Sequence, residues 1–341
     1  MIRRVQYSQS IPPIVKHTAA VPSFMRLRTI LAGTVGGLGL AAAANRTLSS
    51  RAKRLHPPLG QATESYRWRG FDVSYTVAGD SNDPDLLLLH GINAAGSSAE
   101  FAGVFDNLAS DYHVIAPDLP GFGLSDRPPL LYSPSLYATF ITDFARDVTD
   151  ESTVIASSLT GAYVAMAAED EAIDFEEYVL ISPTTSTMPG NRTWVRSLLR
   201  TPLIGEALFN LTSGKRALRH FAIDHAFYDP SSVTDEYIEY RWQLTHQPGA
   251  RFAPASFISG LLDPDVDLGA ALSSLDEPVT LIWGRETETT PLSAGQALAD
   301  EADARLVVFD DTLLLPHVEH PKAFTDLIRE NGSSKAYTAT E

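Results

Sequence analysis

Short apolar runs alternate with amphipathic stretches through most of the chain, and this alternation predicts strands and helices in turn. Residues 71–78 alternate apolar and polar side chains, as a half-buried antiparallel strand does. Continuous apolar runs, typical of parallel strands covered on both faces, follow at 85–90, 112–117, 152–156, 178–181, 279–284 and 305–309. Helical patterns lie between them at 101–108, 135–148, 162–168, 292–302 and 321–329. The pattern predicts an α/β fold, a mostly parallel sheet flanked by helices with right-handed crossovers.

The regular alternation of strands and helices is interrupted in the second half of the chain. Residues 187–270 are helical and irregular, and the strand pattern resumes after them. We therefore expect one α/β core made of residues 63–186 and 271–331, with residues 187–270 inserted as a helical cap. Residues 332–341 are predicted to be a disordered tail.

Residues 1–62 are predicted to be an extension outside the core. Within it, residues 29–44 are sixteen uncharged residues, four of them glycine, between basic flanks. A helix of that length rises about 24 Å, less than the roughly 30 Å of a bilayer core. Two interpretations stay open, membrane association through residues 29–44 and a poorly ordered or surface-docked tail. The location is accordingly cytoplasmic or membrane-associated, and Met25 is an alternative start of translation.

Composition narrows the classes of partner and chemistry. The 341 residues carry a net charge of -16 and contain no cysteine. An acidic protein lacks the basic face that binds phosphates, so nucleic acid is not an expected partner. The missing cysteines exclude disulfides and thiolate chemistry, and no metal cluster or glycine-rich phosphate loop appears. We expect no cofactor, and a small molecule as the substrate or ligand; the pattern does not determine the oligomeric state.

A nucleophilic serine is predicted where the strand at 152–156 passes directly into the helix at 162–168. So sharp a bend needs small residues around its apex, and Ala156, Thr160 and Gly161 surround Ser158. This is the pattern of a nucleophile elbow, usually written G-x-S-x-G. The N-terminus of the following helix favours developing negative charge beside the serine. An ordinary strand-to-helix turn is the alternative interpretation of so short a motif.

Three segments together resemble the α/β-hydrolase family in order and spacing. They are His90-Gly91-Ile92, the turn Asp118-Leu119-Pro120-Gly121-Phe122-Gly123-Leu124-Ser125-Asp126, and the bend at Ser158, and the resemblance covers residues 66–331. It implies a serine hydrolase of carboxylic esters or related acyl compounds. Ser158 would be the nucleophile, and the backbone N–H groups of Ile92 and Leu159 would form the oxyanion hole. His90 would brace the oxyanion loop.

The second half of the chain departs from the family pattern at two positions. Where relatives carry the acid of the triad this chain has Thr287, and where they carry the histidine it has Leu314. Glu288, ahead of Glu286, is the candidate acid beside that position. His317, which matches a structural histidine of relatives, is the candidate base. Loss of two triad members predicts a slow enzyme or none, because a positioned base contributes about 10²- to 10⁴-fold.

Two hypotheses of different classes follow. The first is a Ser158-dependent hydrolase with an atypical base and acid. The second is a non-catalytic protein that uses the cleft under the cap to bind a small apolar ligand or a protein partner. The intact serine and oxyanion motifs favour the first hypothesis, and Thr287 and Leu314 favour the second.

Overall fold

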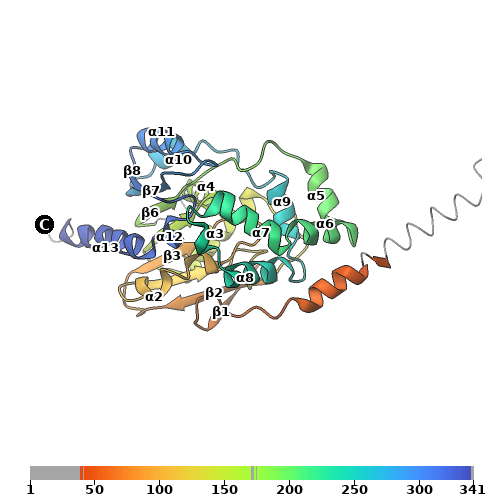
Figure 1. The fold of residues 1–341 in the computed structure, drawn as a ribbon. Helices are drawn as coiled ribbons and strands as arrows, with labels where there is room; N and C mark the ends of the chain where they lie inside the picture. The colour runs from red at the N-terminus through yellow and green to blue at the C-terminus, as the bar shows by residue number, and fades with distance from the viewer. Residues whose placement is uncertain (1–38, 41, 170–172, 174, 339–341) are drawn as a thin grey trace, which may run out of the picture. The chain divides into compact units, whose positions relative to one another are not determined.

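The computed structural model describes residues 39–40, 42–169, 173 and 175–338, and Figure 1 shows their arrangement. The described residues from 42 onward form one compact unit. The apolar segment predicted to associate with a membrane, residues 29–44, lies mostly outside the described residues. Within the described part of the chain, no helix is both long and apolar enough to cross a bilayer.

A single eight-stranded sheet forms the centre of this unit, in the order β1-β2-β4-β3-β5-β6-β7-β8. β1 and β2 form an antiparallel hairpin at one edge, β2 pairs antiparallel with β4, and the remaining pairs are parallel. The strands are β1 Thr63–Trp68, β2 Phe71–Ala78, β3 Asp85–Leu89, β4 His113–Pro117, β5 Ser152–Ser157, β6 Glu177–Ile181, β7 Val279–Gly284 and β8 Arg305–Phe309. The predicted mostly parallel sheet is confirmed.

Helices cover the sheet, and a further group of helical segments after β6 forms the region predicted as a cap. The helices outside that region are η1 Ser98–Phe101, α2 Phe105–Leu108, α3 Pro134–Val148, α4 Leu159–Ala168, α11 Leu292–Ala302, α12 Pro316–Glu319 and α13 Pro321–Thr338, and α10 Leu268–Ser273 crosses its carboxyl-terminal boundary. Those within it are α5 Thr193–Arg200, α6 Ile204–Thr212, α7 Lys215–Phe221, α8 Asp235–Thr245 and α9 Phe252–Ile258, with the π-helical turn η2 Ala222–Ala226 and the 3-10 turn η3 Pro230–Ser232. In Figure 1, α5 and α6 lie at the opposite end of the unit from α13.

The sheet is buried on both faces because its central strands are apolar at nearly every position. In β3, Leu87 and Leu89 pack into a core shared with α3, α4 and α10, whereas Leu86 and Leu88 pack into a second core with α2 and α13. All four leucines are fully buried. The sheet therefore holds its carboxyl-terminal edge rigid, and loops at that edge are fixed at their bases.

Most predicted strands and helices are confirmed within a few residues, and three elements differ. β1 was not predicted because nearly all of its side chains are exposed or partly exposed. The helix expected over 101–108 is instead two short turns, η1 and α2. α13 continues to Thr338, through part of the stretch expected as a disordered tail.

Candidate active site

Ser158 lies at the junction of β5 and α4 in an unusual backbone conformation. Its φ and ψ angles are 56° and -128°, a region that residues with a side chain rarely adopt. Its N–H donates to the carbonyl of Ile181 at 2.8 Å, and its own carbonyl accepts from Gly161 N–H at 3.0 Å. Such a conformation costs about 1–3 kcal/mol and persists where the surrounding structure enforces it. The sheet and the helix together hold Ser158, which is only partly buried, at the edge where parallel strands end.

The loop after β3 is tied to α4 through His90. The ring Nε2 accepts from Leu119 N–H at 3.0 Å, so the ring carries its proton on Nδ1, which donates to the Gly91 carbonyl at 2.9 Å. Thr160 Oγ1 donates to the His90 carbonyl at 2.8 Å. Both ring nitrogens therefore hold the loop in place, as expected for a residue that braces it.

The backbone N–H groups of Ile92 and Leu159 are the predicted donors of an oxyanion hole. Leu159 is the first residue of α4, and Ile92 is a buried residue of the loop that His90 holds. Among the hydrogen bonds of the described residues, none is donated by the N–H of Ile92 or of Leu159. Unpaired donors at a helix N-terminus favour a developing anion.

Asp118, a buried aspartate, fixes the turn after β4, residues 118–126, against the segment that follows β3. Asp118 Oδ1 accepts from Ser98 N–H at 2.7 Å and Oδ2 from Leu124 N–H at 2.6 Å. Gly123 has a φ of 51°, and a Cβ there would overlap the carboxyl group of Asp118. The turn after β4 therefore acts as a rigid support for the loop that leads to η1.

His317 is paired with a glutamate that sequence reasoning did not consider. Its Nε2 lies 3.2 Å from Glu100 Oε1, and the two side chains are 0% and 7% exposed. The two atoms are close, but their alignment is not that of a hydrogen bond. Glu100 Oε2 accepts from Gly91 N–H at 3.1 Å. The His317 ring is enclosed by Phe101 and Phe324, with centroids 5.2 Å and 5.6 Å away.

Glu100 is a buried carboxylate that stays ionised. Burial has the largest single effect and would raise its pKa, but the contacts with His317, Ser157 and His90 together outweigh burial. The pKa of Glu100 falls to about 2 as a result, from an ordinary value of 4.5. The network therefore links α12, η1, the loop after β3 and the last residue of β5, which directly precedes Ser158.

The residues predicted to complete a triad are His317 and Glu288, and they do not form a pair. Glu288 is exposed, Thr287 is buried, and Glu286 accepts from Thr312 N–H at 3.0 Å through Oε2. The carboxylate beside His317 is that of Glu100 and not that of Glu288. Neither ring nitrogen of His317 has a hydrogen-bond partner among the described residues, Ser158 included. Leu314 is partly buried in the turn before α12.

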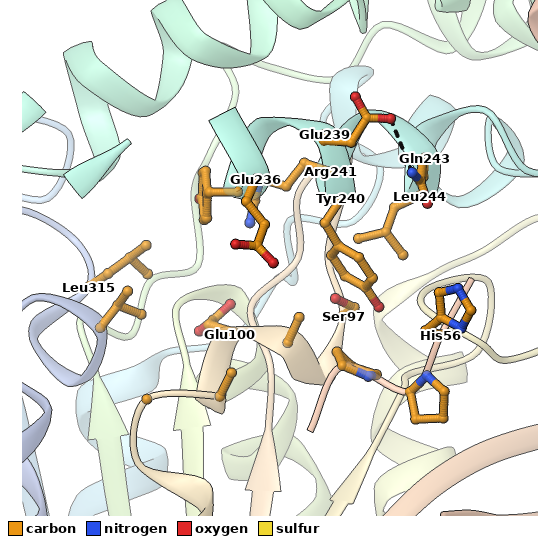
Figure 2. Close-up of a pocket in the computed structure, with 17 residues that line it drawn as sticks. His56, Ser97, Glu100, Glu236, Glu239, Tyr240, Arg241, Gln243, Leu244 and Leu315 are labelled. Atoms are coloured by element: carbon orange, nitrogen blue, oxygen red, sulfur yellow. Dashed lines mark hydrogen bonds between the residues drawn. The ribbon is translucent and has the colours of Figure 1, made fainter. Parts of the chain in front are cut away.

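Two cavities lie between the core and the region predicted as a cap. The larger has a volume of about 570 Å³. Residues of α8 form one of its walls, and Glu100 also lines it. Figure 2 shows Glu236 and Tyr240 extending from α8 into this cavity, whereas Glu239 is turned towards Gln243, whose Nε2 donates to it at 3.0 Å. Cavity size and mixed lining suit a small molecule with polar groups.

The second cavity, about 220 Å³, has a mainly apolar lining. It adjoins the loop after β3 at Asn93, Ala94 and Ala95, and the opposite wall comes from α7, η2 and α9. Arg241 lines both cavities, and its Nη2 donates to Asn93 Oδ1 at 3.1 Å. No cluster of three or more metal-binding side chains occurs among the described residues.

A family model described as "Alpha/beta hydrolase family" matches residues 86–327. This span includes the loop after β3, the bend at Ser158, the helices between β6 and β7, and the segment of His317. The chain belongs to the alpha/beta hydrolase family. The resemblance drawn from the three motifs is thereby confirmed.

This alpha/beta hydrolase is similar over most of its length to several curated proteins. An uncharacterized protein of Mycobacterium tuberculosis is 26% identical over 306 residues, 82% of this chain and 85% of that protein. A pimeloyl-[acyl-carrier protein] methyl ester esterase of Aeromonas salmonicida is 27% identical, covering 75% of this chain and 98% of the esterase. A 2-hydroxymuconate semialdehyde hydrolase of Pseudomonas sp. is 27% identical, covering 71% and 84%.

Solved structures of hydrolases share the fold of this alpha/beta hydrolase. A mutant of the meta-cleavage product hydrolase CumD superposes with a TM-score of 0.64 at 23% identity, covering 80% of this chain and 98% of that one. The esterase RhEst1 from Rhodococcus sp. superposes with a TM-score of 0.61 at 24% identity, covering 80% and 99%.

Glu100, the carboxylate beside His317, was not predicted from the sequence. It is the only acidic residue between Ile92 and Val104, in a stretch of small and apolar side chains. A lone carboxylate so close to a predicted oxyanion loop was the available signal. Its partner His317 is far away in the sequence, and only the fold brings the two together.

Proposed function

We propose that the protein is a serine hydrolase that cleaves small carboxylic esters or related acyl compounds through Ser158. One observation carries the proposal: Ser158 is held at φ 56° and ψ -128° between a strand end and a helix N-terminus. That conformation presents a side chain outward from a sharp bend, the geometry of a nucleophile elbow. Enforced strain at a single polar residue is a feature of functional sites.

The N–H groups of Ile92 and Leu159 form the oxyanion hole in this proposal. The acyl carbonyl would lie against Ser158 with its oxygen towards the two amides, which stabilise the negative charge of the tetrahedral intermediate. His90, Thr160 and Asp118 hold the two donor loops in place through their backbone contacts. Such donors contribute to rate even where the proton acceptor is poor.

His317 is the proton acceptor that we propose, with Glu100 taking the part that sequence reasoning gave to Glu288. Because Nε2 faces Glu100, Nδ1 is the ring atom left to receive the serine proton. Glu100 would stabilise the imidazolium that forms, as the acid of a triad does. The ring is buried and makes no hydrogen bond to Ser158 among the described residues, so this proton transfer is inefficient and the enzyme is slow.

The substrate would bind between the core and residues 187–270, which act as a cap. The apolar cavity beside Asn93, Ala94 and Ala95 is large enough for a short acyl chain or ring. The cavity that reaches Glu100 would hold the more polar leaving group. Similarity to an esterase of a methyl ester and to a hydrolase of a semialdehyde supports hydrolysis of an ester or related compound.

The alternative function is binding of a small apolar ligand without catalysis. Leu314 and Thr287 stand at the positions where relatives carry the histidine and the acid, and this observation favours it. The same cavities would then serve as a binding site. The two functions differ in what happens to Ser158, because a binding protein leaves its hydroxyl unmodified.

Hydrolysis of 4-nitrophenyl acetate and butyrate by the full chain tests the proposal. The wild type should release nitrophenolate above the buffer rate, with an initial burst as the acyl-enzyme accumulates. Ser158→Ala should abolish the burst, whereas the matched control Ser186→Ala, at an exposed serine, should leave it unchanged. If His317 is the base, His317→Ala combined with Ser158→Ala should be no slower than Ser158→Ala alone. Equal rates for wild type and Ser158→Ala would instead favour the binding function.

A further inference from the structure

α6 exposes a row of large apolar side chains to solvent. Ile204, Leu208 and Leu211 are 50%, 36% and 76% exposed, and their spacing places them on one face of the helix. The opposite face, with Phe209 and Asn210, is buried against the rest of the protein. The exposed row therefore does not contribute to the core of the protein, whereas Phe209 on the other side of α6 does.

The neighbouring helix extends this surface. On α5, Trp194 and Leu198 are 67% and 38% exposed, and Leu203 in the turn between the helices is 37% exposed. The two helices meet closely, since a Cβ on Gly205 would overlap the Leu199 carbonyl oxygen. We call the set Trp194, Leu198, Leu203, Ile204, Leu208 and Leu211 the apolar face. Contiguous apolar surface of this kind marks an interaction site in a water-soluble unit.

The charge around the apolar face is opposite to that of the whole chain. Residues 187–221 contain six basic residues and one acidic residue, although the net charge of the chain is -16. Arg192, Arg196 and Arg216 form no salt bridge among the described residues. The apolar face is therefore bordered by free positive charge, which suits an anionic partner.

A second basic segment lies against the same helices. The helix at 42–51 is anchored through Asn45, whose Nδ2 donates to the Leu203 carbonyl at 3.0 Å. Asn210 Nδ2 donates to Asn45 Oδ1 at 3.2 Å. Residues 42–54 contain four basic and no acidic residues, and the uncharged run 29–44 leads into them. Basic charge from two parts of the chain thus converges on α6.

We propose that the apolar face docks on a membrane surface that contains anionic lipid. Exposed leucine and tryptophan side chains would enter the boundary between headgroups and acyl chains, and the surrounding arginines would contact lipid phosphates. The acidic remainder of the protein would be repelled, and this fixes which side faces the bilayer. The proposal concerns α5 and α6 and does not depend on catalysis by Ser158.

Trp194 provides a direct measurement of this docking. The other three tryptophans, Trp68, Trp242 and Trp283, are 3%, 9% and 1% exposed, so Trp194 dominates the response of the fluorescence to solvent. Vesicles of phosphatidylcholine with about 30% phosphatidylglycerol, an anionic lipid, should shift the emission of the full chain to shorter wavelength. Brominated acyl chains should quench it, and Trp194→Phe should remove both effects. Pure phosphatidylcholine vesicles should give a weaker response, because the arginines then lack their anionic partners.

Vesicle flotation with substituted full chains separates the apolar face from other means of attachment. Ile204→Ser with Leu208→Ser should lower the partition onto anionic vesicles about tenfold or more, because apolar contact provides much of the binding. The control Tyr228→Ser removes an exposed aromatic residue outside the apolar face and should leave partition unchanged. Circular dichroism and the activity with 4-nitrophenyl esters should match the wild type in both variants.

Three results would overturn the proposal. The first is vesicle binding with unchanged Trp194 emission, which would place the attachment in the N-terminal extension alone. The second is a dimer in light scattering that Ile204→Ser with Leu208→Ser dissociates, with no vesicle binding, since the apolar face would then join two copies. The third is an unchanged partition of that double variant.

Discussion

Glu100 and His317 face each other in the interior with 3.2 Å between Oε1 and Nε2, and the two side chains are almost completely buried. The glutamate belongs to η1, shortly after the loop that follows β3, and the histidine belongs to α12. Their pairing joins two segments that are far apart in the sequence. In the proposed active site, it brings a carboxylate and an imidazole into one network with Ser157, the neighbour of Ser158.

Loss of the histidine should be more costly than loss of the glutamate. His317→Gln leaves an ionised carboxylate buried with only Gly91 N–H and Ser157 as support, so we expect it to lower the free energy of unfolding by about 3 kcal/mol or more at pH 7. Glu100→Gln removes the charge and keeps an acceptor for Gly91, so we expect a cost of about 1–2 kcal/mol. Urea unfolding of both variants measures these values.

The double variant separates coupling from simple packing. If the two side chains interact, Glu100→Gln with His317→Gln should cost less than the sum of the two single changes. Glu288→Gln is the control, because Glu288 is exposed, and its cost should stay within about 0.5 kcal/mol. Additive costs would mean that the pair contributes no mutual stabilisation.

The same pair predicts how stability depends on acid pH. The pKa of Glu100 in the folded protein is about 2, below its ordinary value of 4.5, so the contribution of Glu100 is complete above about pH 4.5. It should be lost progressively as the pH falls from 4.5 towards 2. The difference in unfolding free energy between the wild type and Glu100→Gln should therefore shrink over that window. A difference that stays constant from about pH 7 to about pH 3 would contradict the assigned pKa.

Relief of the strained backbone at Ser158 should stabilise the protein and abolish its activity. Glycine adopts a φ of 56° with a ψ of -128° without the steric cost of a Cβ. We expect Ser158→Gly to raise the free energy of unfolding by about 1 kcal/mol, whereas Ser158→Ala should leave it nearly unchanged. Thermal and urea unfolding of both variants measure the effect. A Ser158→Gly protein less stable than Ser158→Ala would show that the bend stores no strain.

Most of the sheet could be predicted from the sequence because its strands are buried on both faces. Runs such as Leu86 to Leu89 have no polar position at which a helix could face water, and their spacing along the chain fits a parallel sheet. β1 was missed for the opposite reason, since Thr63 and the two residues after it are exposed. Exposure removes the pattern on which such predictions depend.

The two parts of the proposed site, Ser158 with its loop and the pair of Glu100 and His317, differ in how far the sequence predicts them. The strand-to-helix bend at Ser158 depends on small neighbouring residues, which local sequence shows, whereas the role of His90 was implied by the family resemblance. The partner of His317 depends on how α12 packs against η1, and local sequence does not contain that information. The position of the family motif therefore predicted Glu288 as the partner of His317, whereas the packing of the core places Glu100 beside the His317 ring.

Covalent labelling of the full chain with a fluorophosphonate tests most directly whether Ser158 is the nucleophile. The reagent phosphonylates a serine only where the hydroxyl is activated and an oxyanion hole receives the phosphonyl oxygen. Mass spectrometry of the intact protein should show one adduct, peptide mapping should place it on Ser158, and Ser158→Ala should not be labelled. A folded wild-type protein that acquires no adduct, or acquires one equally in Ser158→Ala, would contradict the proposal.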